Sequence, residues 1–550
     1  MAWSTHEVFN QVAVLKDYNL YATDTVLQEA VEREGAAWHT AALSCHGALL
    51  GEEATIHLGE LANRCAPELT THDRAGHRID QIEFHPAWSK LMEMLYAAGV
   101  HCLPWAMPRP GAHAARAATF FLHGQIEAGS LCPTTMTFAA IPLLMNESAL
   151  FAQLQGNLFS RRYDGRDLPL AQKHAMTIGM GMTEKQGGSD LRGNTTLARR
   201  SGSGGRGEAY ALVGHKWFFS APTSDAHLVL ARADEGLACF YVPRWRTDGT
   251  RNAVRIQRLK QKLGNRSNAS AEVEFCDAEG IMIGVPGRGI ATAIEMAAHT
   301  RLDCVLGSAA LMRQALVQAI HHARQRAAFG RSLIEQPLMQ AVLIDLALES
   351  EAATRLALRL ASACERAAHD PLERALWRIV TPAAKFWICK RTIVVVAECM
   401  EVLGGNGYVE DGPLARLYRE APVNSIWEGS GNVVCLDVLR GLARETAAAQ
   451  ALLNFLTARA GSDTLLASAV GELVACLQKR DAEQAEARWI ARQMILLLQA
   501  TLLAEAAPQY VAEAFISSRM GSGTAVFGAA AQQLSVAQKE DLLARAWPCD

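Results

Sequence analysis

Hydrophobic residues recur at helical spacing in the early and late parts of the chain, and the middle part has a different pattern. From Asn19 to about Gln155, Leu, Ala and Met follow the period of a helix. Between about Ala175 and Gly289, short runs of Val, Ile, Phe and Tyr are separated by Gly, Pro, Asn and Asp, which is typical of antiparallel strands. Long amphipathic patterns return at Ile290 and continue toward the end.

This pattern predicts an α+β fold that is mainly α and has four parts. We expect an N-terminal helical domain over 1–175, a middle antiparallel β domain over 176–289, a helical bundle over 290–444 and an extra helical domain over 445–550. A chain of 550 residues has room for about three to five domains.

Composition narrows the class of protein. Half of the residues are hydrophobic and 20% are charged, which indicates an ordered globular chain. The net charge of −3 gives no chain-wide basic field, so binding to nucleic acid or to an anionic membrane requires a local patch. Thirteen cysteines without a C-x-x-C pair favour a reducing cytoplasm. We expect a soluble protein, since Met494–Leu503 has only about half the length of a membrane-spanning helix.

Several short patterns favour structure over chemistry. Gly202–Gly207 satisfies G-x-G-x-x-G but neither follows a strand nor opens a helix, so we interpret it as a hairpin loop. His123 and Glu127 lie one helical turn apart and could share a ligand, although an exposed or interhelical pair is the better reading. His321 and His322 point to different faces of a helix. We expect no bound metal.

The sequence does not decide the role of two basic segments. The first could meet phosphates or form a solvated strand face, and it contains Arg251, Arg255, Arg258, Lys260, Lys262 and Arg266. The second surrounds Phe329-Gly330, where a helix is expected to end at the glycine, and contains Arg324, Arg326 and Arg331. A solvated helix end is its simplest reading.

Two other segments carry more chemistry. Gly181–Asp190 and Ile426–Asn432 mix hydroxyls with small residues that let backbone N–H groups approach a planar ligand. Taken singly, either could be only a turn. In the second segment Glu428 follows a tryptophan in an apolar setting, which suits a carboxylate to proton abstraction. A capping or salt-bridged glutamate is the alternative.

Five ordered segments, within a match from about Ala97 to Arg444, resemble the acyl-CoA dehydrogenase family of flavoproteins. They are Met182–Asp190 with the pattern M-T-E-x-x-G-G-S-D, Gly214–Ser220, Arg326–Gly330, Leu403–Tyr408 and Trp427–Ser430. The resemblance implies an acyl-CoA dehydrogenase-like fold with a barrel-like middle domain, bound FAD, and a homotetramer built as a dimer of dimers.

The same resemblance implies which residues form the site. Glu428 aligns with the catalytic base that removes the α-proton of an acyl-CoA thioester. Arg326 and Phe329 match positions that reach the FAD of a neighbouring subunit. The matching cofactor-binding positions are Met182, Thr183, Gly188, Ser189, Phe218, Phe219, Ser220, Arg326, Phe329, Ile426, Trp427, Gly429, Ser430 and Asn432.

The chain also departs from the family pattern. Phe218 replaces a tryptophan that many members place against the flavin, and Ser220 replaces a threonine. Pro337 and Glu401 stand where glutamines are common, so the chain departs from the family at positions that make contacts across the dimer.

Three further stretches resemble the branch of the family that acts in the bacterial DNA alkylation response: Trp3–Gln11, Glu127–Pro133 and the C-terminal extension. That branch implies binding of double-stranded DNA and weak dehydrogenase activity. From Ala447 onward, however, eight cations face ten anions, so positive charge would have to come from residues such as Arg440 and Arg444 or from a neighbouring subunit.

Three hypotheses follow. The first is an FAD protein that binds duplex DNA and limits alkylation damage, by shielding DNA or by destroying the agent. The second is a working dehydrogenase for a short or branched acyl-CoA, whose extension is structural. The third is an interaction protein that holds FAD as a filler.

Overall fold

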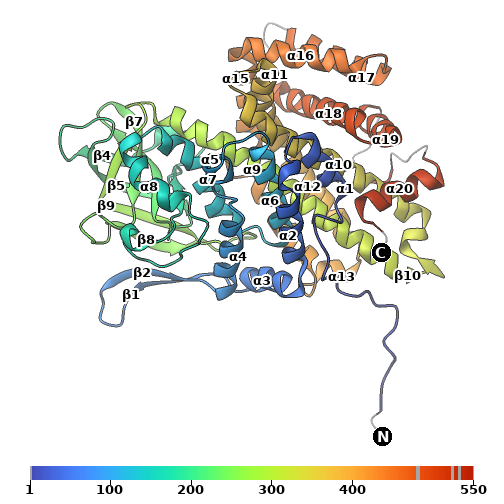
Figure 1. Ribbon diagram of the computed structural model, residues 1–550, viewed down its shortest axis with the longest axis horizontal. Coiled ribbons are helices and arrows are strands. Elements are labelled where there is room, and N and C mark those ends of the chain that lie inside the picture. Colours follow the sequence, from blue (N-terminus) through green and yellow to red (C-terminus); the bar gives the residue numbers. More distant parts are fainter. Residues whose placement is uncertain (1–2, 479–483, 522–525, 530–533, 549–550) are drawn as a thin grey trace. The chain divides into compact units, whose positions relative to one another are not determined.

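The structure is a computed structural model that describes residues 3–478, 484–521, 526–529 and 534–548. The chain divides into two compact units. The β unit comprises 57–303 and 428–430, and the helical unit comprises 1–56, 304–427 and 431–550. Two helices, α3 (Glu53–Arg64) and α9 (Gly289–Gln325), continue from one unit into the other along the chain (Figure 1).

The β unit begins with helices that precede its sheet. One of them, α6, is buried along its whole length, and its Arg116 forms a buried ion pair with Asp303 (Nη2–Oδ2 2.7 Å). Thr135 also donates to Asp303 (2.7 Å), so the start of α9 is bonded to two helices of this unit. The helices after α3 are α4 (Pro86–Ala97), α5 (Leu103–Ala106), α6 (Ala112–Ile126), α7 (Leu131–Met145) and α8 (Ser148–Leu158).

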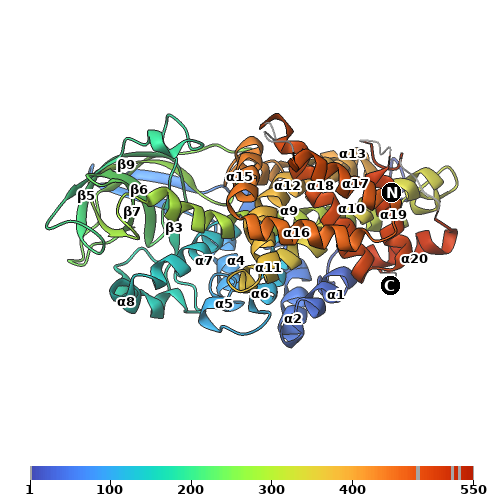
Figure 2. The same cartoon turned by 90° about the horizontal axis from the view of Figure 1, so that it is seen from above.

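A seven-stranded sheet follows these helices. Strands β6, β4, β5, β9 and β7 pair in that order, and β7 pairs again with β6, so the sheet closes on itself (Figure 2). The strands are β3 (Ile178–Gly181), β4 (Leu197–Arg200), β5 (Ala209–Ser220), β6 (Ala226–Ala233), β7 (Gly236–Pro243), β8 (Val254–Leu259) and β9 (Ser270–Ile283). Most side chains on β6 and β7 are buried because the two faces of these strands belong to two different hydrophobic clusters.

The sheet differs from the expected antiparallel pattern at two pairings, because β3 and β4 each run parallel to β6. The hairpin loop predicted at Gly202–Gly207 is confirmed, since it joins the antiparallel strands β4 and β5. The segment does follow a strand, contrary to our expectation, but it leads into β5 and opens no helix.

A second sheet was not predicted. The hairpin β1 (Glu68–His72) and β2 (Arg78–Glu83) stands between α3 and α4, in a region that we interpreted as helical. Asp73 makes its turn by accepting from the backbone N–H groups of Ala75 (2.8 Å) and His77 (2.9 Å), and Gly76 has φ +88°. The turn could have been predicted from the sequence, because an aspartate and a glycine lie within four residues of each other.

The helical unit is built from three parts of the chain. Besides α9, it contains helices from each of these parts. Among them, α18 packs against α10, α12 and α15, and α16 packs against α17. They are α1 (Thr25–Arg33), α2 (Thr40–Gly51), α10 (Pro337–Arg366), α11 (Pro371–Ala375), α12 (Thr381–Val402), α13 (Gly405–Tyr408), α14 (Pro413–Glu420), α15 (Gly431–Arg444), α16 (Thr446–Ala460), α17 (Thr464–Gln478), α18 (Ala487–Ala506), α19 (Gln509–Met520) and α20 (Val536–Ala546).

The C-terminal extension is part of this unit. Ile490 to Leu503 of α18 are almost entirely buried, and Arg545 of α20 donates to Glu29 (3.0 Å) and Glu351 (3.1 Å). The division at residue 444 therefore stays a prediction about sequence organisation. No helix in the described ranges is long and apolar enough to cross a membrane.

The helix end expected at Gly330 was placed wrongly. Helix α9 ends at Gln325, and a small hairpin follows, with strands β10 (Ala327–Ala328) and β11 (Arg331–Ser332). Phe329 and Gly330 form its tip, with φ of +52° and +84°, as a two-residue hairpin turn requires.

Candidate functional site

The loop Met182–Asp190 leaves β3 and turns back toward β5 in the β unit. The carbonyl of Thr183 accepts from the backbone N–H of Trp217 (2.9 Å), and that of Met182 accepts from Asn194 (2.9 Å). A Cβ at Gly188 would lie 2.4 Å from the Thr183 hydroxyl, so only glycine lets the loop fold back this closely. Beyond this anchor, Ser189 and its neighbours are exposed.

Glu184 fixes the same loop from inside. Its Oε1 accepts from Lys216 Nζ (2.8 Å), and neither side chain has exposed area. The hydroxyls and backbone N–H groups of Thr195 and Thr196 complete its shell at 2.6–3.1 Å. Burial alone would raise the pKa of Glu184, but these partners hold it well below its usual range. The sequence analysis included Glu184 in the motif Met182–Asp190 but did not predict that it fixes the loop from inside.

An irregularity in β5 presents two aromatic rings. The pairing with β9 shifts register between Lys216 and Phe219, as in a β-bulge. Lys260 Nζ lies 3.4 Å from the ring centroid of Trp217 and 4.7 Å from that of Phe218. The Phe218 side chain is 55% exposed and so is available to a ligand.

Phe219 points the other way. Its ring is 1% exposed, stacks on His227 with centroids 3.9 Å apart, and belongs to the core of the sheet. Any contact between Phe219 and a cofactor would therefore come from its backbone.

Glu428 lies in the β unit beside the start of α9. Its Oε2 accepts from the Thr300 hydroxyl (2.6 Å), and its backbone carbonyl accepts from Arg301 Nε (3.1 Å). Its φ of +56° is unusual for a residue with a side chain, and Gly429 follows with φ +101°. No hydrogen bond that we find among the described residues engages Oε1. The partners Thr300 and Arg301 were missed, since they precede Glu428 by 128 and 127 positions.

The buried Cys132 thiol responds to the charge of Glu428. Burial raises the pKa of the Cys132 thiol to about 12, with the charge of Glu428 acting in the same direction. Lys262 and hydrogen bonds with Ser220 and Asn268 oppose that shift. Ser220, predicted as a cofactor contact, thus lies in the neighbourhood of the candidate base.

His123 and Glu127 are buried, so the expectation of an exposed pair was wrong. Both meet Ser130, with His123 Nε2 3.2 Å and Glu127 Oε2 2.6 Å from its hydroxyl. Glu127 also accepts from Ser267 (2.6 Å), which ties α6 to the loop before β9. Within the ranges that the structure describes, no group of histidine, cysteine and acidic residues could hold a metal ion.

Gly429 and Ser430 belong to the β unit together with Glu428, whereas the other predicted residues, Arg326, Phe329, Ile426, Trp427 and Asn432, belong to the helical unit. Phe329 is 97% exposed at the tip of its hairpin. The base of the hairpin is held by Asn10, which donates to the carbonyl of Ala327 (2.9 Å), accepts from its N–H (2.9 Å), and receives Arg326 on its own carbonyl.

The N-terminus of α15 is rich in positive charge. Asn432 accepts from Arg488 Nε (2.8 Å), and a Cβ on Gly431 would lie 2.9 Å from Lys390 Cε. Ile426 is exposed, and Trp427 donates to Asn424 (3.1 Å). A helix N-terminus flanked by two cations favours an anionic group.

Most cations of the extension are engaged within the unit. Arg459 pairs with Glu505 (2.9 Å), and Arg519 and Arg545 pair with buried carboxylates. Lys479 and Arg480 lie outside the described residues. By contrast, Arg440 and Arg444 are exposed one turn apart on α15.

The basic segment around β8 separates into two sets. Arg258 and Lys260 share Glu272 (2.7 and 2.6 Å), and Lys262 donates to the Asn268 carbonyl (2.5 Å). Arg251 and Arg255 instead line a cavity described below.

Three family models match the chain. "Adaptive response protein AidB N-terminal domain" matches residues 10–165, "Acyl-CoA dehydrogenase, middle domain" matches 179–278, and "Acyl-CoA dehydrogenase, C-terminal domain" matches 287–443.

Individual proteins match over nearly the whole length. AidB of Escherichia coli (strain K12) is 53% identical over 500 residues, which are 90% of this chain and 91% of the relative. The crystal structure of Caenorhabditis elegans ACDH-11 in complex with C11-CoA has a TM-score of 0.84 at 26% identity and covers 99% of this chain and 93% of its own. The structure named Bd2924 apo-form has a TM-score of 0.81 at 28% identity, with 90% and 100% covered.

Proposed function

Because the chain belongs to the AidB family of acyl-CoA dehydrogenases and is an FAD-dependent oxidoreductase of that type, we propose that it oxidises a small acyl-CoA thioester with Glu428 as the base. The observation that carries this proposal is the placement of the Glu428 carboxylate. Thr300 donates to its Oε2, Arg301 donates to its backbone carbonyl, and we find no hydrogen bond to Oε1 among the described residues.

The residues present suit the flavin. The exposed Phe218 ring lies one residue from the N–H that binds Thr183, so an aromatic surface and the hydroxyl loop adjoin each other. Taken by itself, the start of α15 in the helical unit, with Lys390 and Arg488 beside it, suits an anionic group such as a pyrophosphate. When bound, FAD supplies the acceptor for the substrate's β-hydride.

The chain's own part in the reaction is proton transfer and positioning. Glu428 Oε1 takes the α-proton of the thioester, and the Thr300 hydroxyl keeps the carboxylate oriented while it does so. Left-handed backbone at Glu428 and Gly429 directs the side chain toward Thr300 of α9 rather than along its own segment.

Anaerobic flavin bleaching by a panel of acyl-CoAs tests the base. We expect bleaching with a short or branched chain, and loss of at least about 100-fold in its rate in Glu428→Gln. Glu60→Gln on α3 changes an exposed carboxylate and should leave the rate unchanged. Absence of bleaching with every chain length, in a protein that retains its flavin, would refute the dehydrogenase function.

Thr300→Val tests the positioning role. Loss of one hydrogen bond to a charged group should lower kcat about tenfold and leave KM within about twofold. Thr300→Ser should restore kcat. A variant that raises KM alone would contradict the role that we assign.

A second function concerns DNA. The 53% identity to AidB extends over 90% of this chain, so it reaches into the C-terminal extension, and the name of the N-terminal family model refers to the adaptive response. We infer that the protein binds double-stranded DNA through Arg440 and Arg444, because the described cations of the extension are largely paired internally. Protection against alkylating agents, by shielding or by chemical destruction, would follow from that binding.

Point variants test DNA binding better than truncation, since removing 445–550 would also remove α18 and expose the faces of α10, α12 and α15 against which it packs. Arg440→Gln with Arg444→Gln should weaken duplex binding and reduce the slope of log affinity against log salt by about two. The matched control is Arg199→Gln on β4, another exposed arginine. Binding that is absent at low salt, or equal in both variants, would favour the alternative of a dehydrogenase with a purely structural extension.

We also propose a homotetramer in the cytoplasm. Phe329 supports the assembly, because a phenylalanine that is 97% exposed on an ordered turn is suited to burial in a neighbouring subunit. Sedimentation velocity would establish the subunit number.

A further inference from the structure

A cavity of about 760 Å³ lies in the β unit beside the β1–β2 hairpin. Its walls come from β2, the start of α4, the segment 163–167, Thr223 and the segment 244–255. We call it the hairpin cleft. Its lining includes neither Glu428 nor any predicted flavin contact, so it is separate from the candidate active site.

The lining of the hairpin cleft carries an excess of positive charge. Four arginines face it, Arg78, Arg244, Arg251 and Arg255, against two aspartates, Asp80 and Asp167, which leaves two positive charges. The whole chain has a net charge of −3, so this concentration is local.

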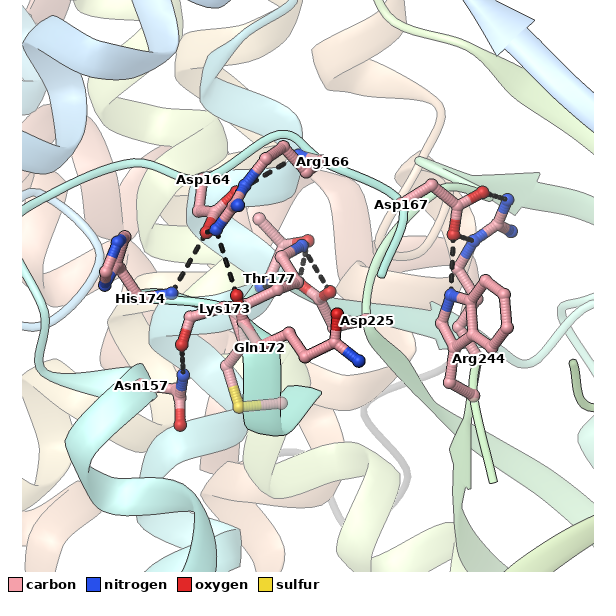
Figure 3. Close-up of polar contacts among 12 residues, drawn as sticks. Asn157, Asp164, Arg166, Asp167, Gln172, Lys173, His174, Thr177, Asp225 and Arg244 are labelled. Carbon is pink, nitrogen blue, oxygen red and sulfur yellow. Dashed lines mark hydrogen bonds and ion pairs between the residues drawn. The ribbon is translucent and has the colours of Figure 1, made fainter. Parts of the chain in front are cut away.

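Asp167 serves two of the arginines at once. It accepts from Arg244 Nε (3.0 Å) and Nη2 (2.8 Å), as Figure 3 shows, and also from Trp245 Nε1 (2.8 Å) and from Arg251. Arg244 gives its remaining Nη1 to the Pro222 carbonyl (3.0 Å) and is fully used. Burial lowers the pKa of Arg251, and the nearby Arg244 charge adds to that effect. One carboxylate therefore does not neutralise this pair.

The other two arginines come from β2 and β8. Arg78 gives Nε to Asp80 (2.9 Å) and Nη2 to the Ile256 carbonyl (2.5 Å), so only Nη1 remains for a ligand. Asp80 also accepts from the Ile256 N–H (3.2 Å), which fixes the hairpin on β8. Arg255 is exposed, and we find no ion pair for it within the described part of the chain.

Aromatic side chains complete the lining. Phe84 and Trp88 stack with centroids 5.1 Å apart and an interplanar angle of 18°. Trp245 lies beneath Arg251, with the guanidinium 5.1 Å from its ring. Flat rings beside unneutralised guanidinium groups suit a ligand that is planar at one end and anionic at the other.

We propose that the hairpin cleft binds a small phosphate-bearing aromatic molecule of the nucleoside-phosphate class. Arg255, Arg251 and Arg78 hold the phosphates, and the ring lies among Trp245, Phe84 and Trp88. The volume of about 760 Å³ falls within the usual range for small-ligand pockets and suits one nucleotide better than a continuous strand. This proposal does not rest on the dehydrogenase or DNA function.

Calorimetric titration of the flavin-loaded full chain with ADP, adenosine and pyrophosphate tests the site. ADP should bind at least about tenfold tighter than either fragment, because each fragment lacks one half of the recognition. Arg255→Gln should weaken ADP about tenfold, which is about 1.4 kcal/mol. Arg199→Gln, an exposed arginine on β4 outside the cleft, should leave ADP affinity unchanged.

Trp245→Leu provides an independent variant. It should weaken ADP severalfold and leave pyrophosphate affinity unchanged, because it removes a ring and no charge. Acyl-CoA bleaching should proceed unchanged in both cleft variants, so failure of this site and failure of the dehydrogenase are distinguishable.

Three results would overturn the proposal. In the first, ADP binds no better than pyrophosphate, and Arg255→Gln and Arg199→Gln weaken it equally, which indicates nonspecific charge attraction. In the second, acyl-CoA displaces ADP and Arg255→Gln has no effect, which places ADP at the acyl-CoA site. In the third, Arg255→Gln lowers duplex DNA affinity but not ADP affinity, which makes the cleft a nucleic-acid contact.

Discussion

Replacing Glu184 with glutamine should locally unfold the loop that carries Met182, Thr183 and Ser189. The change keeps the shape of the side chain but leaves the Lys216 ammonium, which has no exposed area, without its counter-charge. Breaking a buried ion pair by removing one partner costs about 3–5 kcal/mol.

The structure also sets an upper limit on this cost. Burial already lowers the pKa of Lys216 from 10.5 to about 8 despite the opposing effect of Glu184. Without Glu184, Lys216 can escape by losing its proton, which at pH 7 costs about 3.5 × 1.4, or roughly 5 kcal/mol. The unfolded lysine then binds one more proton than the folded one, so stability must rise with pH, and the limit falls to about 2 kcal/mol at pH 9.

Native-state hydrogen exchange measures this locally and needs no two-state unfolding of a 550-residue chain. At pH 7, protection of the Trp217 amide, which binds the Thr183 carbonyl, should fall by roughly two to nearly four orders of magnitude in Glu184→Gln. Lys216→Met should cost less, because Glu184 keeps its donors from Thr195 and Thr196.

The matched control is Glu93→Gln, which breaks an exposed ion pair of the same 2.8 Å length with Lys90. Its local effect on α4 should stay within about fivefold, because exposed pairs contribute about 0–1 kcal/mol. Equal effects of the two substitutions, or a Glu184→Gln penalty that grows from pH 7 to pH 9, would refute the reasoning from burial.

Three further predictions follow from single features. Burial lowers the pKa of His113 from 6.5 to about 3, so on acidification the unfolded chain binds this proton before the folded protein does. The free energy of unfolding should therefore fall as the pH drops from about 6.5 toward 3. His113→Phe should make the melting temperature depend less on pH over that range, whereas His57→Gln, at an exposed position, should not. Phe329→Ser should leave helix content by circular dichroism unchanged and raise the subunit dissociation constant at least about tenfold in sedimentation equilibrium; unchanged assembly would exclude a contact across subunits. Arg545→Gln should lower the melting temperature by several degrees, since among the described residues it leaves Glu29 and Glu351 with Arg355 as their one shared arginine, and Glu29→Gln in the same chain should recover part of the loss.

Sequence patterns identified the family and the fold, and the comparisons confirm both, together with FAD as cofactor. Such patterns succeed where function imposes several special residues on one short segment, as in Met182–Asp190. The site assignments stay predictions, although the structure shows which side chains are available. Phe218 presents its ring, whereas Phe219 buries its own, and strand alternation across an irregular register decides between these neighbours.

Long-range partners escaped sequence analysis for a physical reason. Thr300 sits in a helix of uniform amphipathic pattern, and only folding brings its hydroxyl to Glu428. The β1–β2 hairpin was missed because its strands are short and polar, with Asp80 and Arg78 bonded to β8 instead of filling a core. Single-segment periodicity carries no information on such contacts.

The ion pair between Glu29 and Arg545 joins residues 516 positions apart. During synthesis, the first helices of the helical unit therefore cannot complete their packing until nearly the whole chain has left the ribosome. Segment 57–303 of the β unit is contiguous and is complete much earlier. The order of folding thus follows from the topology, with the β unit first and the helical unit last. Nascent chains that stall near the end would hold a finished β unit tethered to unassembled helices, which makes them natural clients for chaperones.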